Sequence, residues 1–502
     1  MEEKFKLFDF SQEKVRVLHY TWIAFFLTFF VWFNMAPLKT AMTESFDFLN
    51  GGNFKALLLC NVALTIPARI IIGALVDRYG PRVVFSGLMV VTVIPGLMFA
   101  FGSTFLQLVI SRLLLSSIGA GFVIGIKMTD NWFSPQHIGR AEGFYAGWGN
   151  FGSAAAAGLI PYIGLVLIGG EFGWRYAMAI SSIATGLYGI FYYFKVKDYP
   201  TGKEVIVDKR SSSIMPVSSY GGLVQYLMWN IPLYAALGLL ARNLQKQVIY
   251  DKNMYSIDVM YMMWGVLALF YFYKAYKILA HNLPRLKEGI PEREKFAFSS
   301  IGALNLTYFA NFGAELAVVS MLPFFFESTF KISPQLAGLV AGSFAVINLV
   351  ARPLGGYMSD KMGSRRNTML MYMMGISIGF GLMGLISKYG PITEDGAQTL
   401  VPMFEGTWWL VVSVLITMFG SMFVQGAEGA TFAMIPAIKK ELTGRIAGMA
   451  GAFGNVGAVT YLFILSMVDS KTFFFILAGG AALSFIYCFF SLKEPEGAFG
   501  NK

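Results

Sequence analysis

Residues 57–82 read LLLCNVALTIPARIIIGALVDRYGPR, and residues 339–366 read LVAGSFAVINLVARPLGGYMSDKMGSRR. Each stretch is an apolar run that contains one arginine, Arg69 in the first and Arg352 in the second. In both stretches a glycine follows the arginine by four residues, an aspartate by eight and a basic residue by nine. The shared pattern indicates an internal repeat, with one copy in each half of the chain.

The composition favours a membrane protein. Of the 502 residues, 56% are hydrophobic and only 14% are charged, whereas soluble proteins have about 25% charged residues. Apolar runs recur along the chain, each close to the roughly 20 residues that a helix needs to cross a bilayer. These runs are apolar throughout and do not alternate as the strands of a membrane barrel do. We therefore expect an all-α membrane protein.

Fourteen apolar segments are expected to be transmembrane helices, in the order six, two and six. They lie at 18–38, 54–76, 83–103, 106–128, 140–168 and 174–195, then 220–241 and 257–280, then 298–326, 336–358, 367–387, 408–432, 446–468 and 472–492. Because the inserted number is even, both halves keep the same orientation. The expected parts are a cytoplasmic N-terminal segment (1–17), a six-helix bundle (18–196), a linker with two extra helices (197–295), a second six-helix bundle (296–493) and a cytoplasmic tail (494–502).

The net charge of +10 does not indicate a nucleic-acid partner, because the basic residues are spread over several short loops. These residues are Arg78, Arg82, His137, Arg140, Lys195, Lys197, Lys203, Lys209, Arg210, Lys361, Arg365, Arg366, Lys439, Lys440 and Arg445. All these loops fall on one side of the predicted membrane. By the positive-inside rule that side is cytoplasmic. We expect a multi-pass protein of the cell (inner) membrane with both termini in the cytoplasm.

A second repeat pairs GRAEGFYAGWGNFG (139–152) with GRIAGMAGAFGNVG (444–457) without a gap. Glycines at this density let helices approach closely. Each copy holds one asparagine, whose amide can donate to an anion or bond across helices. An arginine near the middle of a membrane helix costs roughly 2.5–3.5 kcal/mol. Either Arg69 or Arg352 alone could pair with a buried acid or a helix end, but their equivalent positions favour a paired site for an anion.

Together these features resemble the nitrate/nitrite porter family of the major facilitator superfamily. The loops that follow each repeated arginine resemble the superfamily pattern. The segments AGWGNFG, AGAFGNVG, FVWFNMAPL and YFANFGAELAVVSMLP resemble the porter family. The resemblance covers both six-helix halves and leaves out the inserted pair. It implies the major facilitator fold, with two six-helix bundles plus two inserted helices, and a small inorganic anion as substrate.

The resemblance also implies roles for individual residues. Two arginines would clamp one nitrate or nitrite near the midplane, with an aromatic pair and two asparagines beside it. The matching positions are Arg69, Arg352, Tyr308, Phe312, Asn150 and Asn455. A planar guanidinium can meet two oxygens of a flat anion at once, which a lysine cannot. For the asparagines, bonding between helices stays open as an alternative.

Further charged residues are candidates for a cytoplasmic gate, namely Asp77, Arg78, Asp360, Lys361, Arg140 and Arg445. Two acids stand within apolar runs. Glu315 shares a helix face with the aromatic pair, because it lies seven residues after Tyr308 and three residues after Phe312. Glu428 stands where many relatives have an uncharged residue. Each acid is either a proton-coupling site or a local partner of other groups; for Glu428 we favour a counter-charge for an arginine or a gate residue.

The expected function is secondary transport of nitrate, nitrite or both by alternating access. The sequence has no GxxxxGK[ST] loop for ATP, so either a gradient, such as one of protons, or exchange for a second anion would supply the energy. It has no cluster with metal-ligand spacing and no recognisable nucleophile–base pair, so we expect no enzyme, cofactor or metal. Cys60 and Cys488 are expected to be buried thiols. Alternatives are a transporter of another small anion and a transport-deficient anion sensor; a monomer is expected.

Overall fold

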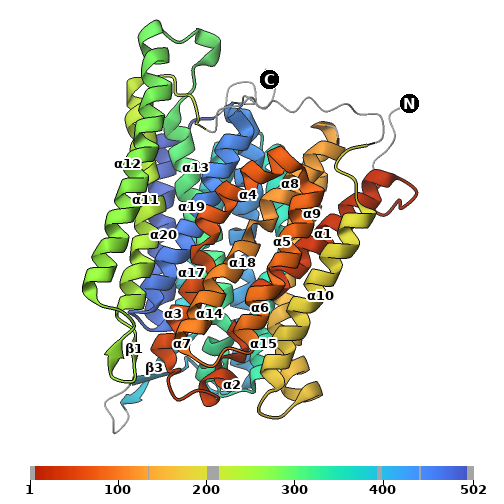
Figure 1. The fold of residues 1–502 in the computed structure, drawn as a ribbon, viewed down its shortest axis with the longest axis vertical. Helices are drawn as coiled ribbons and strands as arrows, with labels where there is room; N and C mark the ends of the chain where they lie inside the picture. The colour runs from red at the N-terminus through yellow and green to blue at the C-terminus, as the bar shows by residue number, and fades with distance from the viewer. Residues whose placement is uncertain (1–5, 134, 201–213, 393–397, 440–441, 495–502) are drawn as a thin grey trace.

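The computed structural model describes residues 6–133, 135–200, 214–392, 398–439 and 442–494. Within them the chain forms fourteen helical rods, several of which are broken into two or three helices in succession. The rods lie side by side (Figure 1). Buried apolar side chains fill the space between them. The protein is a multi-pass all-α membrane protein.

The rods follow the predicted order of six, two and six. The first six are α1–η1–α2 (Glu13–Trp32, Ala36–Leu38, Lys39–Glu44), α3–α4 (Gly51–Ala63, Thr65–Tyr79), α5–α6 (Pro81–Val91, Val93–Ala100), α7–η2–α8 (Phe105–Leu115, Ser116–Ala120, Gly121–Trp132), α9–η3 (Pro135–Pro161, Tyr162–Ile168) and α10 (Gly173–Lys195). The insertion consists of α11 (Tyr220–Gln245), the strands β1 (Val248–Ile249) and β2 (Lys252–Asn253), α12 (Ile257–Glu288) and η4 (Glu292–Glu294).

The second half repeats this arrangement. Its rods are α13–α14 (Phe298–Ala310, Phe312–Phe330), α15–α16 (Pro334–Val346, Asn348–Lys361), α17 (Arg365–Gly384), α18 (Thr407–Ile438), α19 (Thr443–Leu465) and α20 (Ser470–Ser491). An antiparallel hairpin of β3 (Ser387–Ile392) and β4 (Gln398–Pro402) joins α17 to α18. Neither this hairpin nor the β1–β2 hairpin was expected from the sequence.

Each predicted helix is present, and the largest error lies at the end of α12. Twelve rods of the described chain are long and apolar enough to cross a membrane by length and composition, and α12 and α17 complete the set. The sequence predicts that the helix of α12 ends at residue 280, where the apolar run stops. The helix instead continues to Glu288 and ends at Gly289, whose φ of 88° only glycine adopts readily. This extra length projects beyond the other helices (Figure 1).

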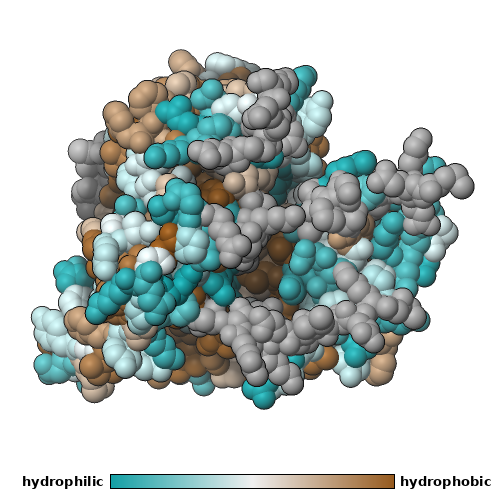
Figure 2. Space-filling model, turned by 90° about the horizontal axis from the view of Figure 1, so that it is seen from above, coloured by the Kyte–Doolittle hydropathy of each residue, from teal (hydrophilic) through white to brown (hydrophobic). Residues whose placement is uncertain are grey.

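Because the number of rods is even, α1 begins and α20 ends at the same face, which we call the termini face (Figure 1). The opposite face carries both β-hairpins, and we call it the hairpin face. Figure 2 views the termini face, which is hollowed near its middle, with hydrophobic residues deep in the hollow.

The two glycine-rich repeats pack in the same way in both halves. A Cβ atom on Gly152 of α9 would overlap the carbonyl oxygen of Phe26 on α1. A Cβ atom on Gly457 of α19 would overlap the carbonyl oxygen of Phe309 on α13. Both phenylalanines precede the repeated arginine of their half by 43 residues. The internal repeat is therefore also a repeat in three dimensions, and its glycines are required by backbone contact.

On the hairpin face, polar contacts join the two halves. Lys55, in the first turn of α3, donates to the carbonyl oxygens of Leu465 at 2.8 Å and Val468 at 3.2 Å, at the C-terminal end of α19. A cation is favourable there because helix C-termini carry partial negative charge. The hydroxyl of Thr40 on α2 donates to the carboxylate of Glu327 on α14. These contacts close the hairpin face between the halves.

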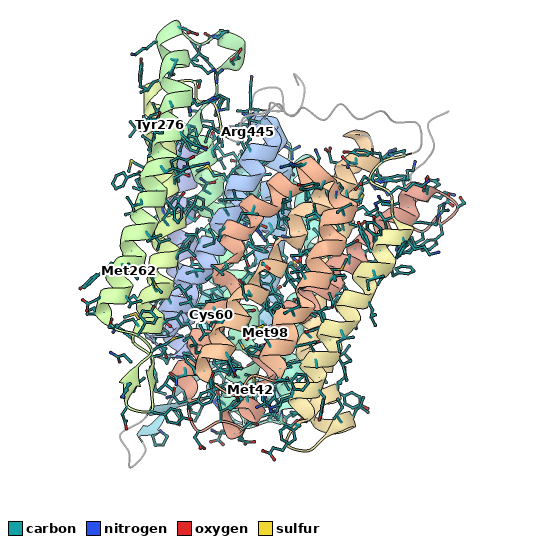
Figure 3. The ribbon with its side chains drawn as sticks, viewed as in Figure 1. Met42, Cys60, Met98, Met262, Tyr276 and Arg445 are labelled. Atoms are coloured by element: carbon teal, nitrogen blue, oxygen red, sulfur yellow. The ribbon has the colours of Figure 1, made fainter. Side chains whose placement is uncertain are left out.

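The insertion touches both halves near the hairpin face. The side-chain amide of Asn243 on α11 donates to the hydroxyl of Ser466, 2.9 Å away, just after α19. The ring of Tyr250 in the β1–β2 hairpin lies 6.4 Å from that of Phe48 in the first half, edge to face. By contrast α12 exposes most of its side chains, as Met262 and Tyr276 illustrate in Figure 3. That outer surface suits contact with lipid.

The cysteine prediction is confirmed. Cys60 and Cys488 are both buried and free. Cys60 lies on α3 (Figure 3), which packs against α7 of the first half and α19 of the second.

Gly338 offers a test of the closure of the hairpin face. A Cβ atom there would overlap the backbone carbonyl oxygen of Ala157 across the two halves, and backbone cannot move aside as a side chain can. We expect Gly338→Ala to destabilise the protein by about 1–3 kcal/mol. The control is Gly479→Ala, where a Cβ atom would meet nothing within 4 Å. Thermal unfolding of the purified proteins should show a lower Tm for Gly338→Ala alone; equal Tm values would contradict this interpretation.

Candidate functional site

The two repeated arginines occupy equivalent places in the structure. Arg69 is the fifth residue of α4 and Arg352 the fifth of α16. In each half this helix follows a break in the second rod, at Leu64 and at Ile347. The side chains are only 4% and 3% exposed. The structure thus buries both of the repeated arginines, far from the ends of the rods.

Both guanidinium groups lie on the same aromatic ring. The central carbons of Arg69 and Arg352 are each 5.6 Å from the ring centre of Phe122, at the start of α8. Arg69 also lies 5.1 Å from the ring centre of Phe312. Cations at such distances are attracted by the negative face of the ring. The ring of Phe122 therefore links the arginine of one half to that of the other.

Sequence reasoning missed Phe122. The residue stands in the glycine-rich apolar run GAGFVIG at 119–125, where an aromatic side chain most often only packs. Nothing in that run distinguishes Phe122 from the many other phenylalanines of the chain. Its position became evident only from its contacts.

Each arginine keeps N–H groups without a partner among the described residues. Arg69 donates through one terminal nitrogen to the carbonyl oxygen of Gly451 at 2.7 Å, while its Nε and other terminal nitrogen have none. Arg352 donates to the hydroxyl of Tyr308 at 3.4 Å and forms an ion pair with Glu428, while its remaining terminal nitrogen has no partner. Buried donors are nearly always satisfied in native proteins. Free donors on two adjacent guanidinium groups can bind an anion.

The predicted aromatic pair belongs to the same cluster. The rings of Tyr308 and Phe312 stack 5.0 Å apart with an angle of 9° between their planes. Both rest on Gly454 of the second glycine-rich repeat, where a Cβ atom would come within 2.6 Å of Phe312 and 2.8 Å of Tyr308. The glycine thus provides the space in which the aromatic pair stacks beside Arg352.

The two predicted asparagines differ in their contacts. Asn455 is fully buried, and its amide donates at 3.2 Å to the carbonyl oxygen of Gly451, which also accepts from Arg69. Asn150 is 1% exposed, and neither its oxygen nor its nitrogen has a partner among the described residues. Asn455 therefore adjoins the arginine cluster, whereas the contacts of Asn150 do not connect it to either arginine.

The two membrane acids lie beside Arg352. Glu428 on α18 is its ion-pair partner, which is the counter-charge arrangement considered from the sequence. One oxygen of Glu315 accepts from the amides of Asn348 at 2.8 Å and Gln425 at 3.0 Å. Gln425 precedes Glu428 by three residues on α18, so both acids adjoin the same face of that helix. Neither Asn348 nor Gln425 carried a signal in the sequence, because a single amide in an apolar run has no characteristic spacing.

The predicted gate residues lie away from this cluster. The side chains of Arg78, Lys361 and Arg140 are exposed and that of Arg445 is half-buried. The side chains of Asp77 and Asp360 are outside the part of the chain that the structure describes. The gate assignment therefore stays a prediction.

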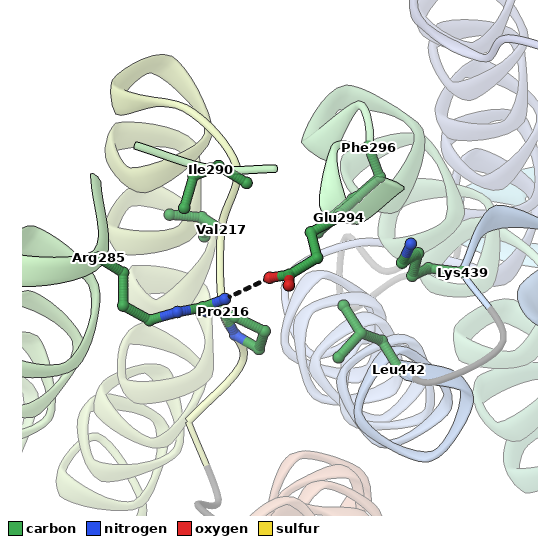
Figure 4. Close-up of a pocket in the computed structure, with 8 residues that line it drawn as sticks. All are labelled: Pro216, Val217, Arg285, Ile290, Glu294, Phe296, Lys439 and Leu442. Carbon is green, nitrogen blue, oxygen red and sulfur yellow. Dashed lines mark hydrogen bonds and ion pairs between the residues drawn. The ribbon is translucent and has the colours of Figure 1, made fainter. Parts of the chain in front are cut away.

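A separate pocket of about 420 Å³ lies between the insertion and the second half (Figure 4). The ion pair of Arg285 with Glu294, 2.8 Å apart, spans it. Lys439 and Leu442, from the connection between α18 and α19, line its other side. Because this pocket contains none of the predicted substrate-binding residues, the candidate site remains the buried cluster around the two arginines.

Comparison with known proteins identifies the family. The model of the Major Facilitator Superfamily matches residues 21–303 and 304–502. The nitrate/nitrite transporter NrtP of Nostoc punctiforme is 42% identical over 499 residues, which cover 98% of this chain and 95% of that protein. The protein of the same name from Picosynechococcus is 40% identical over 527 residues, or 97% and 94% of the two chains.

Among solved structures, the partially occluded inward-open conformation of the xylose transporter XylE from E. coli matches with a TM-score of 0.61. The match covers 96% of this chain and 99% of that chain at 15% identity, so it concerns the fold alone. The fold, the paired signatures and the relatives agree: the chain belongs to the nitrate/nitrite porter family of the major facilitator superfamily, a family of transporters and not of enzymes.

Proposed function

We propose that this protein transports nitrate, nitrite or both across the cell membrane, with Arg69 and Arg352 holding the anion together. One observation carries the proposal: two buried guanidinium groups, one from each half, share the ring of Phe122 and retain N–H groups without partners among the described residues. The two relatives of about 40% identity are named nitrate/nitrite transporters. Both lines of support concern the same class of ligand.

The chemistry of the cluster suits a flat monoanion. A guanidinium presents parallel N–H groups that meet two oxygens of one planar ion. The rings of Phe122, Tyr308 and Phe312 offer flat walls on which the Tyr308 hydroxyl is the one donor, so they suit a weakly hydrated ion better than a strongly hydrated one. A divalent anion would lose more hydration than two arginines can replace.

Alternating access follows from the placement of the arginines. Each half contributes one, so an anion held by both joins the halves at their centre. The hairpin face is closed by contacts such as Lys55 with Leu465, while the termini face is hollowed (Figure 2). Rocking of the two bundles would open the hairpin face and close the termini face. With the basic loops in the cytoplasm, this conformation opens inward.

Reconstitution in proteoliposomes tests the proposal. Nitrate and nitrite are offered on either side of the membrane, and flux is followed together with binding. Flux of either ion supports the proposal. Binding without flux would identify an anion sensor, and flux of a different small anion alone would identify another substrate; either result would overturn the proposal.

Lysine at either arginine tests the clamp. We expect Arg69→Lys and Arg352→Lys each to lose nearly all transport although the charge is retained, because an ammonium cannot provide two parallel donors. Arg242→Lys is the control, since Arg242 is exposed at the end of α11. Uptake into proteoliposomes measures the effect, after correct insertion has been checked. Normal uptake by either clamp variant would refute the assignment.

Two glycines of α19 provide a matched pair for the aromatic wall. Gly454→Ala should displace the stacked rings of Tyr308 and Phe312, and we expect nitrate affinity to fall about tenfold or more, which corresponds to about 1.4 kcal/mol. Gly448→Ala should have little effect, because a Cβ atom at that position meets nothing within 4 Å. Titration calorimetry compares both variants with the parent protein. If both variants lost the same nitrate affinity, the effect of alanine on helix α19, and not its contact with the two rings, would explain the loss.

Competition between anions tests selectivity. Nitrate and nitrite should compete for one site, whereas sulfate and phosphate should compete poorly, because a second negative charge brings hydration that this buried cluster cannot replace. The measurement is displacement of bound nitrate from the purified protein. Efficient displacement by sulfate would contradict the proposed basis of selectivity.

A further inference from the structure

The ion pair of Arg352 with Glu428 places a carboxylate where the proposed anion would bind. The two side chains are 3% and 0% exposed, so water does not screen the pair. One terminal nitrogen of this guanidinium, Nη2, contacts both Glu428 and Tyr308, while the other terminal nitrogen has no partner among the described residues. An anion that takes both outer nitrogens of Arg352 must therefore replace Glu428. This reasoning rests on the proposed function.

The charges of the cluster balance without an anion. Arg69 and Arg352 contribute two positive charges, and Glu315 and Glu428, when ionised, contribute two negative charges. The other titratable groups that face them are Tyr308 of α13 and Tyr145 of α9. A bound monoanion would leave one uncompensated negative charge, which is costly in a buried site. One proton restores neutrality.

The hydrogen bonds indicate where that proton would lie. Oε1 of Glu315 already accepts from the amides of Asn348 and Gln425, while its Oε2 has no partner among the described residues. Gln425, which donates to Glu315, precedes Glu428 by three residues on α18, so Glu315 and Glu428 adjoin the same face of that helix. Two ionised carboxylates in one buried cluster repel each other, whereas a proton on one of them removes that repulsion.

The two amides tie this pair to the clamp. Gln425 precedes Glu428 by three residues on α18, and Asn348 precedes Arg352 by four on α16. Both amides donate to the same oxygen of Glu315, so they fix the orientation of its carboxyl group. The other oxygen therefore also points in a fixed direction. Asn348 and Gln425 are in this sense positioning residues for the carboxyl pair.

We propose that Glu428 is a displaceable counter-ion of Arg352 and that the Glu315–Glu428 pair takes up one proton when nitrate or nitrite replaces it. The proton comes from the solution on the side where the anion enters and forms an O–H bond with one carboxylate. On the other side that bond breaks, the proton leaves with the anion, and Glu428 again pairs with Arg352. The cluster is neutral both when loaded and when empty, so the carrier reorients in both states and performs net cotransport.

Calorimetric titration of the purified full-length protein with nitrate, in buffers of different ionisation enthalpy, counts the protons taken up. We expect about one proton per nitrate, and a Kd that rises about tenfold for each pH unit once the pair is ionised in the empty protein. Nitrate binding with no proton uptake and a constant Kd would overturn this inference and leave the proposed function intact. Absence of both binding and flux would instead overturn the proposed function.

Variants locate the proton. In Glu428→Gln the amide no longer competes for Arg352, so nitrate should bind without proton uptake and with a pH-independent Kd. In proteoliposomes this variant should exchange nitrate for nitrite but lose net uptake driven by a pH gradient, because its empty site keeps a positive charge. Glu142→Gln, an acid of α9 outside the cluster, should keep the pH dependence of the parent. Proton uptake that persists in Glu428→Gln would refute the assignment, and should that variant fail to fold, the proton count of the parent protein decides.

Discussion

Burial of two guanidinium groups in the middle of a membrane protein is the constraint on which the rest of the structure depends. Each charge must find partners where water cannot supply them. Arg69 of the first half finds the carbonyl oxygen of Gly451 in the second half. Arg352 of the second half lies on the ring of Phe122 in the first. The partners cross between the halves, so the arginine cluster itself holds the two bundles together at their centre.

Close backbone contact supplies the geometry that these partners need. Gly454 leaves room for the stacked rings beside Arg352, and Gly457 on the same helix lets α19 meet the backbone of α13. Gly152 makes the corresponding contact in the first half. The glycine-rich signatures therefore act mainly through the side chains that they lack, since a methyl group at any of these places would overlap a neighbouring group.

Much of this could be predicted from the sequence, because a bilayer imposes the same length and polarity on every spanning helix. The fourteen rods and the equivalence of Arg69 and Arg352 followed from apolar runs and the repeat. Contacts made between distant helices could not be predicted in this way. Phe122 and Gln425 have no local signal in apolar runs, and the extension of α12 to Gly289 lies beyond the apolar segment that defined it.

The repeat is symmetric in its arginines but not in their partners. Arg69 donates a hydrogen bond to a backbone carbonyl oxygen, whereas Arg352 forms an ion pair with Glu428, close to Glu315. Two arginines without acids would leave a positive charge on the empty carrier and favour exchange of one anion for another. Both acids belong to the second half, whereas each half contributes one arginine of the clamp, so only the second half carries the groups that neutralise the empty site. Within the proposed mechanism, substitution of these two acids alone would change the coupling, while both arginines of the clamp stay in place.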